Sequence, residues 1–232
     1  MVRVTIIPGL GQGGRIREIR EDGNKLLLDV AGRPAILWQL DFVLPDFCVI
    51  ACHPDHAPAV QHVVGTSAIV VKYKAHNEPW GLAKFMQDIT RLMDGDIVLS
   101  LLFCDTLFMP GTDYTALTIP GTLVIADVED GGRFLNVVGI DEQGFVTEWA
   151  DHPYDGKPAK ATVGLYTLPV REWKKALEAP DEDNVGHQFI ERAKFTTIST
   201  DAWLDIGVPE SYRETCTRLF SARRNCWLWR RW

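Results

Sequence analysis

The sequence predicts an α/β protein with a Rossmann-like three-layer α/β/α arrangement and a mixed, mainly parallel sheet. Three observations support this prediction. The chain has 232 residues, of which 46% are hydrophobic, which suffices for one α/β domain with a substantial core. β-Branched runs alternate with segments of helical period through the first half, as in βαβ units. After Asp105 the pattern changes to successive short strands, so the second half has an α+β character.

In the first half, strands are expected at residues 2–7, 47–52, 68–73 and 96–103. The helices expected between them span residues 34–44, 56–64 and 81–93. Pro34 stands at the first position of the first helix, where its missing N–H removes no helical hydrogen bond. This alternation is typical of nucleotide-binding proteins.

In the second half, strands are expected at residues 122–127, 134–140, 145–149 and 161–168, with a hairpin turn at 141–144. Helices are expected at residues 171–178, 187–193 and 209–220. No stretch rich in Pro, Gly or Ser separates the halves. We therefore expect one domain over residues 1–221, with halves of about 1–110 and 111–221, followed by a tail at 222–232.

The composition excludes several classes of protein. The formal net charge is −7 with both signs interspersed, which argues against a general nucleic-acid binder. No apolar stretch approaches the roughly 20 residues that cross a bilayer, and the N-terminus lacks a signal-peptide pattern, so a cytoplasmic location is expected. The five cysteines form no CxxC pair, which argues against a zinc ribbon or a disulfide framework.

Four glycines follow the first strand directly: Gly9, Gly11, Gly13 and Gly14. Such a loop can direct backbone N–H groups at a phosphate without intervening side chains. It contains the GxGxxG pattern, but the following residues 15–23 are charged and end in Asp-Gly, whereas a Rossmann dinucleotide site needs an apolar helix there. No Gly-Lys-Ser/Thr closes a Walker A loop either. A glycine-rich turn that binds no ligand is the simplest alternative.

Motifs along the rest of the chain indicate what the loop binds. Lys25 precedes an apolar triplet, and Gly-Arg-Pro then opens a helix. Later come Glu-Pro-Trp-Gly-Leu-Ala at 78–83, Phe-Cys-Asp-Thr at 103–106, Val-Gly-Leu-Tyr at 163–166 and Trp-Leu-Asp-Ile-Gly-Val-Pro at 203–209. In this order, from about Val4 to Tyr212, they resemble the motifs of the sugar-phosphate nucleotidyltransferases, which implies a GT-A-like nucleotidyltransferase fold.

The chain ends soon after the Trp-x-Asp block. It therefore resembles the short members of that family, without a C-terminal β-helix. These include hexose- and muramate-1-phosphate nucleotidyltransferases and phosphocholine cytidylyltransferases of bacterial surface-polymer pathways. The resemblance implies transfer of a nucleotidyl group from a nucleoside triphosphate to a sugar 1-phosphate or similar phosphorylated small molecule, with Mg²⁺ as cofactor and pyrophosphate as the second product. A homodimer is compatible with this family.

The resemblance also implies roles for the charged residues. Arg15 would meet the departing β- and γ-phosphates with its planar fork of donors. Lys25 would contact the α-phosphate and the acceptor phosphate, while Asp105 and Asp205 would hold Mg²⁺. The position of Asp105, directly after the apolar run 97–103, independently indicates the carboxyl end of a buried strand, where open α/β sheets bind ligands.

The remaining site residues also follow from the resemblance. The nucleotide would contact a set of loop and helix residues, namely Gly9, Leu10, Gly11, Gly13, Gly14, Glu78 and Gly81. The acceptor would contact Glu148 and Gly164, and either Lys157 or Lys160 would replace a lysine that the family carries after Glu148. Several positions depart from the family pattern, which leaves the base and the acceptor open: Gly14, Asn24, Leu82, Cys104 and Val208.

Two other functions are compatible with the sequence. A GT-A glycosyltransferase would use a nucleotide sugar, but its usual Asp-x-Asp motif is incomplete because Leu107 follows Asp105 at the second acidic position. A non-catalytic, nucleotide-binding regulatory protein is the other. Cys104 is expected to be a buried strand-end residue rather than a nucleophile, since no histidine lies near it in the sequence. The tail, rich in Trp and Arg, is expected to pack on the body or on a second subunit rather than on a membrane surface.

Overall fold

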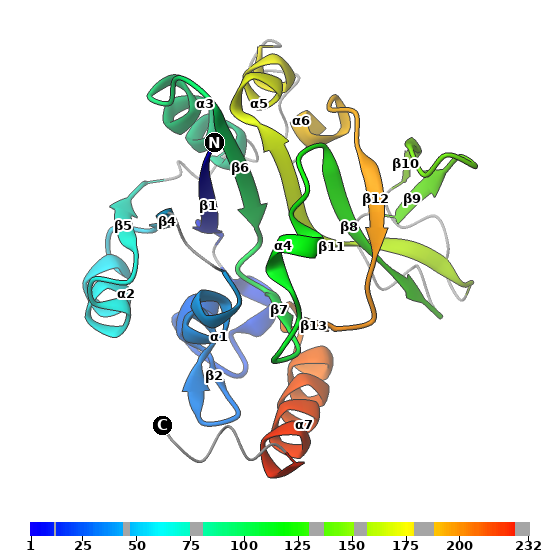
Figure 1. Ribbon diagram of the computed structural model, residues 1–232. Coiled ribbons are helices and arrows are strands. Elements are labelled where there is room, and N and C mark those ends of the chain that lie inside the picture. Colours follow the sequence, from blue (N-terminus) through cyan, green and yellow to red (C-terminus); the bar gives the residue numbers. More distant parts are fainter. Residues whose placement is uncertain are drawn as a thin grey trace.

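A nine-stranded mixed sheet forms the centre of the protein in the computed structural model (Figure 1). The structure describes residues 1–11, 13–43, 47–74, 81–129, 137–150, 157–178 and 188–225. The main path of the sheet is β10-β9-β11-β6-β1-β4-β5, with β8 paired to β11 and β12 paired to β8. The strands are β1 (Val2–Gly9), β2 (Asp29–Val30), β3 (Arg33–Pro34), β4 (Phe47–Cys52), β5 (Ile69–Lys72), β6 (Ile97–Leu102), β7 (Thr106–Phe108), β8 (Thr122–Val128), β9 (Val137–Ile140), β10 (Val146–Ala150), β11 (Ala159–Pro169), β12 (Thr196–Ser199) and β13 (Trp203–Asp205).

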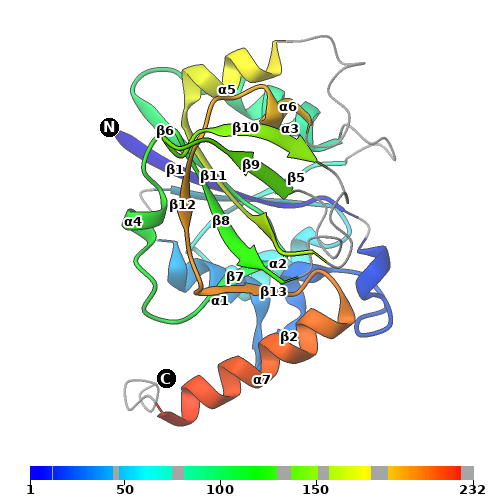
Figure 2. The same cartoon turned by 90° about the vertical axis from the view of Figure 1, so that its right-hand side faces the viewer.

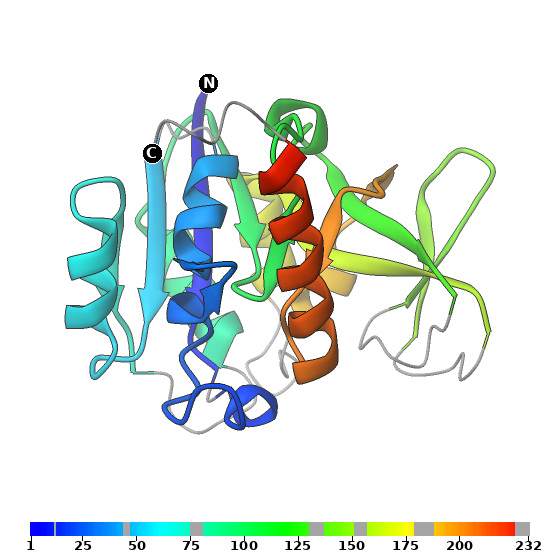
Figure 3. The ribbon, with the colours of Figure 1, turned by 90° about the horizontal axis from the view of Figure 1, so that it is seen from below.

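Helices cover both faces of this sheet. The helices are α1 (Ala35–Phe42), α2 (Ala57–Val64), α3 (Gly81–Arg91), α4 (Tyr114–Leu117), α5 (Val170–Leu177), α6 (Gln188–Glu191) and α7 (Pro209–Asn225), with 3-10 turns η1 (Gly14–Ile16) and η2 (Lys25–Leu27). One core cluster joins α3, α5 and α6 to the sheet, and a second joins α1, α2 and α4 to it. Figure 3 shows α1, α2 and α7 in front of the strands. The predicted three-layer α/β/α class is therefore confirmed.

Parallel pairing around β1 brings the functional loops together. β1 pairs in parallel with both β4 and β6, and β4 pairs in parallel with β5. Parallel strands end at the same edge of a sheet, so the loop after β1 and the turn after β6 emerge side by side. The sequence separates these two segments by about 90 residues, but the sheet makes them neighbours.

The second half of the chain adds the antiparallel part of the sheet. The long strand β11 pairs in antiparallel fashion with β6, β8 and β9, and β9 forms a hairpin with β10. The predicted turn at 141–144 is present, because the amide of Gly144 donates to the carbonyl of Asp141 at 3.0 Å. Figure 2 shows the β9–β10 hairpin and β11 crossing the upper part of the molecule, with α7 along its base.

Most predicted elements agree with the observed ones to within three residues. The short strands β2, β3, β7, β12 and β13 and the helix α4 were not predicted. Helix α7 continues to Asn225, beyond the predicted helix end at residue 220 and the predicted boundary after residue 221. Residues 134–136 and 187, and residues 226–232 of the tail, lie outside the described residues. Within the described residues, no helix combines the length and apolarity needed to cross a membrane.

Candidate active site

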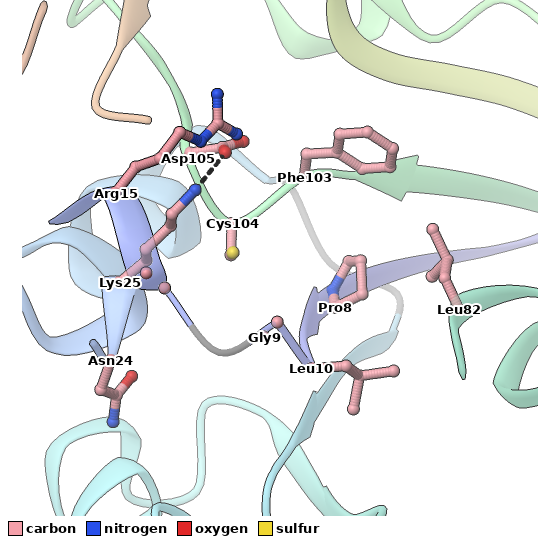
Figure 4. A pocket seen from close by; sticks show the side chains of 13 residues that line it. Pro8, Gly9, Leu10, Arg15, Asn24, Lys25, Leu82, Phe103, Cys104 and Asp105 are labelled. Carbon is pink, nitrogen blue, oxygen red and sulfur yellow. Dashed lines mark hydrogen bonds and ion pairs between the residues drawn. The ribbon is translucent and has the colours of Figure 1, made fainter. Parts of the chain in front are cut away.

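A pocket of about 420 Å³ opens where β1 and β6 end (Figure 4). Its lining comes from the glycine loop, the Lys25 segment, the start of α3 and the turn after β6: Pro8, Gly9, Leu10, Gly11, Gly13, Gly14, Arg15, Asn24, Lys25, Leu82, Phe103, Cys104 and Asp105. Figure 4 shows the two cationic side chains on one side and Pro8, Leu82 and Phe103 on the other. The pocket thus has a charged end and an apolar end.

The glycine loop is fixed at some positions and open at others. Gly13 has a φ of 59°, and a Cβ on it would overlap the backbone of Gly23. A Cβ on Gly9 would overlap the side chain of Leu26. By contrast, a Cβ on Gly11 or Gly14 would meet nothing within 4 Å. The loop is therefore anchored at Gly9 and Gly13, while Gly11 and Gly14 expose backbone to the pocket.

Lys25 forms an ion pair across the pocket. Its Nζ lies 2.7 Å from Oδ2 of Asp105, and the two side chains are only 13% and 24% exposed. Burial by itself lowers the pKa of Lys25, but the Asp105 carboxylate more than offsets this, so the pKa is raised above its usual value. Lys25 is therefore a cation at neutral pH.

The second predicted metal ligand reaches the pocket through a two-stranded ribbon. β13 pairs with β7, which sets Asp205 opposite Thr106, and the amide of Ile206 donates to the carbonyl of Asp105 at 3.0 Å. A Cβ placed on Gly207 would lie 3.0 Å from Oδ1 of Asp205 and 3.3 Å from Oδ2 of Asp105. Both carboxylates thus approach one small space beside Gly207.

The environment of Asp205 disfavours its negative charge. Burial raises the pKa of Asp205, the nearby Asp105 carboxylate raises it further, and hydrogen bonds from Ser211 and Gly207 offset only part of this. Two carboxylates that repel each other in a partly buried space are suited to sharing a cation.

The carboxylate pair fits Mg²⁺. This ion takes one or two carboxylates and completes its coordination with phosphate oxygens and water. Among the described residues, no group of three or more His, Cys, Asp or Glu side chains could hold a metal by itself. A metal at Asp105 and Asp205 would accordingly draw its other ligands from a bound phosphate and solvent.

Arg15 extends from η1 toward the same end of the pocket as Lys25 (Figure 4). It is exposed and forms no hydrogen bond or ion pair with the described part of the chain. Its charge acts on Lys25, whose pKa it lowers slightly against the larger effect of Asp105. Arg15 is thus a cation at the pocket mouth whose donors are available to a ligand.

The structure gathers most of the predicted site residues. All of the predicted loop residues line the pocket together with Lys25 and Asp105, and Asp205 lies beside Asp105. Gly81 is the first residue of α3 and adjoins Leu82, which lines the pocket. Glu78 lies outside the described residues.

The two predicted acceptor residues do not line this pocket. Glu148 is exposed on β10 at the edge of the sheet. Gly164 has a φ of 78°, and a Cβ on it would lie 2.6 Å from Oγ1 of Thr106. The carbonyl of Gly164 accepts a hydrogen bond of 2.8 Å from the amide of Phe103. Gly164, on β11, therefore supports the turn that carries Asp105.

Lys157, Lys160 and Cys104 were also considered from the sequence, and the structure shows the surroundings of each. Nζ of Lys160 lies 2.7 Å from Oδ1 of Asp127 at the surface, whereas Lys157 is exposed. Burial raises the pKa of the Cys104 thiol to about 12, and Asp105 adds to this rise. A thiol with so high a pKa is a poor nucleophile at neutral pH. The sequence predicted a buried residue at a strand end, but Cys104 is half-buried in the turn after β6 and lines the pocket.

Sequence reasoning missed several residues of the site. Phe103 forms part of the apolar end of the pocket. Asn24, which the sequence marked only as a departure from the family pattern, also lines the pocket; it is 4% exposed, and its side-chain amide nitrogen has no hydrogen-bond partner among the described residues. Gln39 is 1% exposed and bonds to the turn that carries Asp105. The signal for Gln39 was a polar residue on the otherwise apolar helix segment Ala-Ile-Leu-Trp-Gln-Leu.

Comparison with known proteins gives the fold a counterpart. No protein-family model matches the sequence, and no curated protein matches it. Among solved structures, a Bacillus anthracis protein described as a glucose-1-phosphate thymidylyltransferase is similar with a TM-score of 0.73 and 19% identity, over 94% of this chain and 95% of that one. CTP:phosphocholine cytidylyltransferase from Streptococcus pneumoniae is similar with a TM-score of 0.72 and 14% identity, over 94% and 100%. HddC from Yersinia pseudotuberculosis is similar with a TM-score of 0.68 and 21% identity, over 94% and 99%. The chain therefore has the fold of these nucleotidyltransferases, as the sequence predicted.

Proposed function

We propose that the protein is a Mg²⁺-dependent nucleotidyltransferase. It transfers a nucleoside monophosphate from a nucleoside triphosphate to a sugar 1-phosphate or a similar phosphorylated small molecule, and it releases pyrophosphate. The observation that carries the proposal is the convergence of Lys25, Asp105 and Asp205 beside an open glycine loop. The similarity in fold to a thymidylyltransferase and a cytidylyltransferase supports it.

The two ends of the pocket suit the two parts of a nucleotide. The glycine loop, Arg15 and Lys25 form a phosphate-binding end, since backbone N–H groups and cations favour anions. Leu82 and Phe103 form an apolar end that suits a nucleobase. The triphosphate would then extend from the apolar end toward Arg15.

The reaction needs no protein nucleophile. A phosphate monoester has its second pKa near ~6, so the acceptor is largely dianionic at neutral pH. One of its oxygens attacks the α-phosphorus, the bond from that phosphorus to the bridging oxygen of the β-phosphate breaks, and the electron pair leaves with pyrophosphate. Catalysis then consists of positioning and of stabilising the charge that develops.

The chain's own charged groups match those tasks. Lys25, held as a cation beside the loop, would stabilise charge at the α-phosphate and bring the acceptor phosphate close. Arg15 would bind the departing pyrophosphate with its free donors. Asp105 and Asp205 would hold Mg²⁺, which when bound neutralises phosphate charge.

Because nucleoside triphosphates are cytoplasmic substrates, we infer that the protein works in the cytoplasm and supplies activated precursors for surface polysaccharides.

The proposal is tested by pyrophosphate release. The protein is incubated with Mg²⁺, each of CTP, UTP, GTP, ATP and dTTP, and a panel of hexose 1-phosphates and phosphocholine. We expect release with at least one pair, and loss of most of it in Lys25→Met. No release with any pair from folded protein would contradict the proposal. Equal release by wild type and Lys25→Met would contradict the role of Lys25.

A further inference from the structure

The carboxylate of Asp105 stands on a tight turn between β6 and β7. The amide of Thr106 donates to the carbonyl of Phe103 at 3.0 Å, which closes a four-residue turn with Cys104 and Asp105 at its tip. The side chain of Asp105 itself bonds to Lys25. The direction of this carboxylate therefore depends on how firmly the backbone of the turn is held.

A buried glutamine from α1 spans this turn. Nε2 of Gln39 donates to the carbonyl of Phe103 at 2.8 Å and to the carbonyl of Thr106 at 2.9 Å. Carbonyl oxygens only accept hydrogen bonds, so the NH₂ of the amide must face them. Both of its hydrogens are thus bonded to the first and last residues of one turn, while its buried Oε1 has no hydrogen-bond partner in the described part of the chain. The side chain acts at this place through its two donors.

The other hydrogen bonds that hold the turn come mainly from the backbone. The carbonyl of Gly164 accepts from the amide of Phe103, and the amide of Ile206 donates to the carbonyl of Asp105. Within the described residues, Gln39 is the side chain that donates to the carbonyls of this turn. The helix α1, which carries Gln39, also contacts the segment that carries Lys25. The amide of Ala35, the first residue of α1, donates to the carbonyl of Leu28 directly after η2.

We propose that Gln39 is a positioning residue that aims the Asp105 carboxylate at the space it shares with Asp205. The role rests on the proposed function, since it presumes that these carboxylates hold a divalent cation. Gln39 does not line the pocket, so it would contact neither substrate nor metal. It acts by fixing both ends of the turn, so that the cation meets a preformed pair of carboxylates and binding need not order the turn.

Gln87 offers a matched control. It is also a buried glutamine on a helix, 7% exposed on α3, and its Nε2 donates to the carbonyl of Leu177 at 3.0 Å. That bond lies on the opposite face of the sheet from α1, between α3 and α5, and Gln87 does not line the pocket. Gln39→Met and Gln87→Met each keep side-chain length and remove an amide, so both should lose some thermal stability.

The test measures the binding of Mn²⁺ to the full chain in the absence of nucleotide. Electron paramagnetic resonance reports the concentration of the free ion. We expect Gln39→Met to weaken Mn²⁺ binding about 10-fold, as loss of an outer-shell contact commonly does. Gln87→Met should bind Mn²⁺ as wild type does. If both variants bind Mn²⁺ like wild type, the role of Gln39 is overturned.

Asp105→Asn separates failure of this role from failure of the metal site. If Asp105→Asn binds Mn²⁺ as wild type does, the metal site itself is wrong. If Asp105→Asn loses binding and Gln39→Met does not, only the role of Gln39 is wrong. Should Gln39→Met not fold, Gln39→Asn takes its place, with Gln87→Asn as control, because the shorter amide cannot reach both carbonyls of the turn.

Discussion

The two walls of the pocket are built in opposite ways. The turn at 103–106 is fastened from α1, β11 and the segment after β13, and its one functional carboxylate is already paired with Lys25. The loop at 9–15 is anchored at Gly9 and Gly13, but it leaves Gly11 and Gly14 open and Arg15 exposed. This difference indicates that the proposed metal side is preformed, whereas the proposed phosphate side would gain its partners from the ligand.

The largest effect is expected at the turn at 103–106, which carries Asp105. Asp105→Asn should lower turnover about 10³-fold, equivalent to about 4 kcal/mol, because it removes both a proposed metal ligand and the partner of Lys25. It should also reduce the free energy of unfolding by about 1–3 kcal/mol, since a half-buried ammonium loses its partner. Steady-state kinetics and urea unfolding measure the two effects. Turnover within about 10-fold of wild type would contradict the preformed metal side.

The next largest effect is expected at Gly13, which anchors the loop at 9–15. Gly13→Ala forces a left-handed φ on alanine and drives its Cβ into the backbone of Gly23, so we expect a loss of about 2–4 kcal/mol in unfolding free energy. Gly14→Ala is the matched control. A Cβ there meets nothing within 4 Å, so stability should change by less than about 0.5 kcal/mol. Equal losses in the two variants would show that the loop is not anchored at Gly13.

A smaller effect is expected for Arg15, the exposed cation of the loop at 9–15. Arg15→Leu should raise the KM for the nucleoside triphosphate about 10-fold or more while leaving stability unchanged, because the side chain has no partner in the described chain and meets the ligand only. Arg17→Leu, an exposed arginine two residues on that does not line the pocket, is the control. If Arg15→Leu unfolds more easily than Arg17→Leu, the cation serves the fold and not the ligand.

The smallest effect concerns the pH dependence of stability. The folded-state pKa of Asp205 is raised, so the native state holds this proton more tightly than the unfolded chain does. The contribution of Asp205 therefore favours folding at low pH and is lost as pH rises from the ordinary carboxyl range through the raised value. Asp205→Asn removes this loss and should raise the melting temperature at pH 7 by up to about 3 °C, while activity falls. A melting temperature that drops at pH 7, measured by calorimetry, would contradict the unfavourable charge at Asp205.

The two walls also differ in how far the sequence could predict them. The glycine loop and Asp105 follow from local patterns, because each lies where a strand ends, whereas Lys25 was assigned through the resemblance of its motif to a known family. Gln39 and Gly164 act on the 103–106 turn across about 60 residues, and such contacts leave no periodic signal. β7 and β13 are three residues each, too short for alternation to show, although they deliver Asp205. The roles of Glu148 and Gly164 toward the acceptor stay predictions.

The central claim is that the pocket directs attack to the α-phosphorus of a triphosphate whose β- and γ-phosphates leave together. The most direct test uses the nucleotide that supports pyrophosphate release, labelled with ³²P at either the α- or the γ-position, with the acceptor and Mg²⁺. Our account predicts that the α-label appears in an organic product and the γ-label in pyrophosphate. Transfer of the γ-label to the acceptor, or its release as orthophosphate, would contradict it.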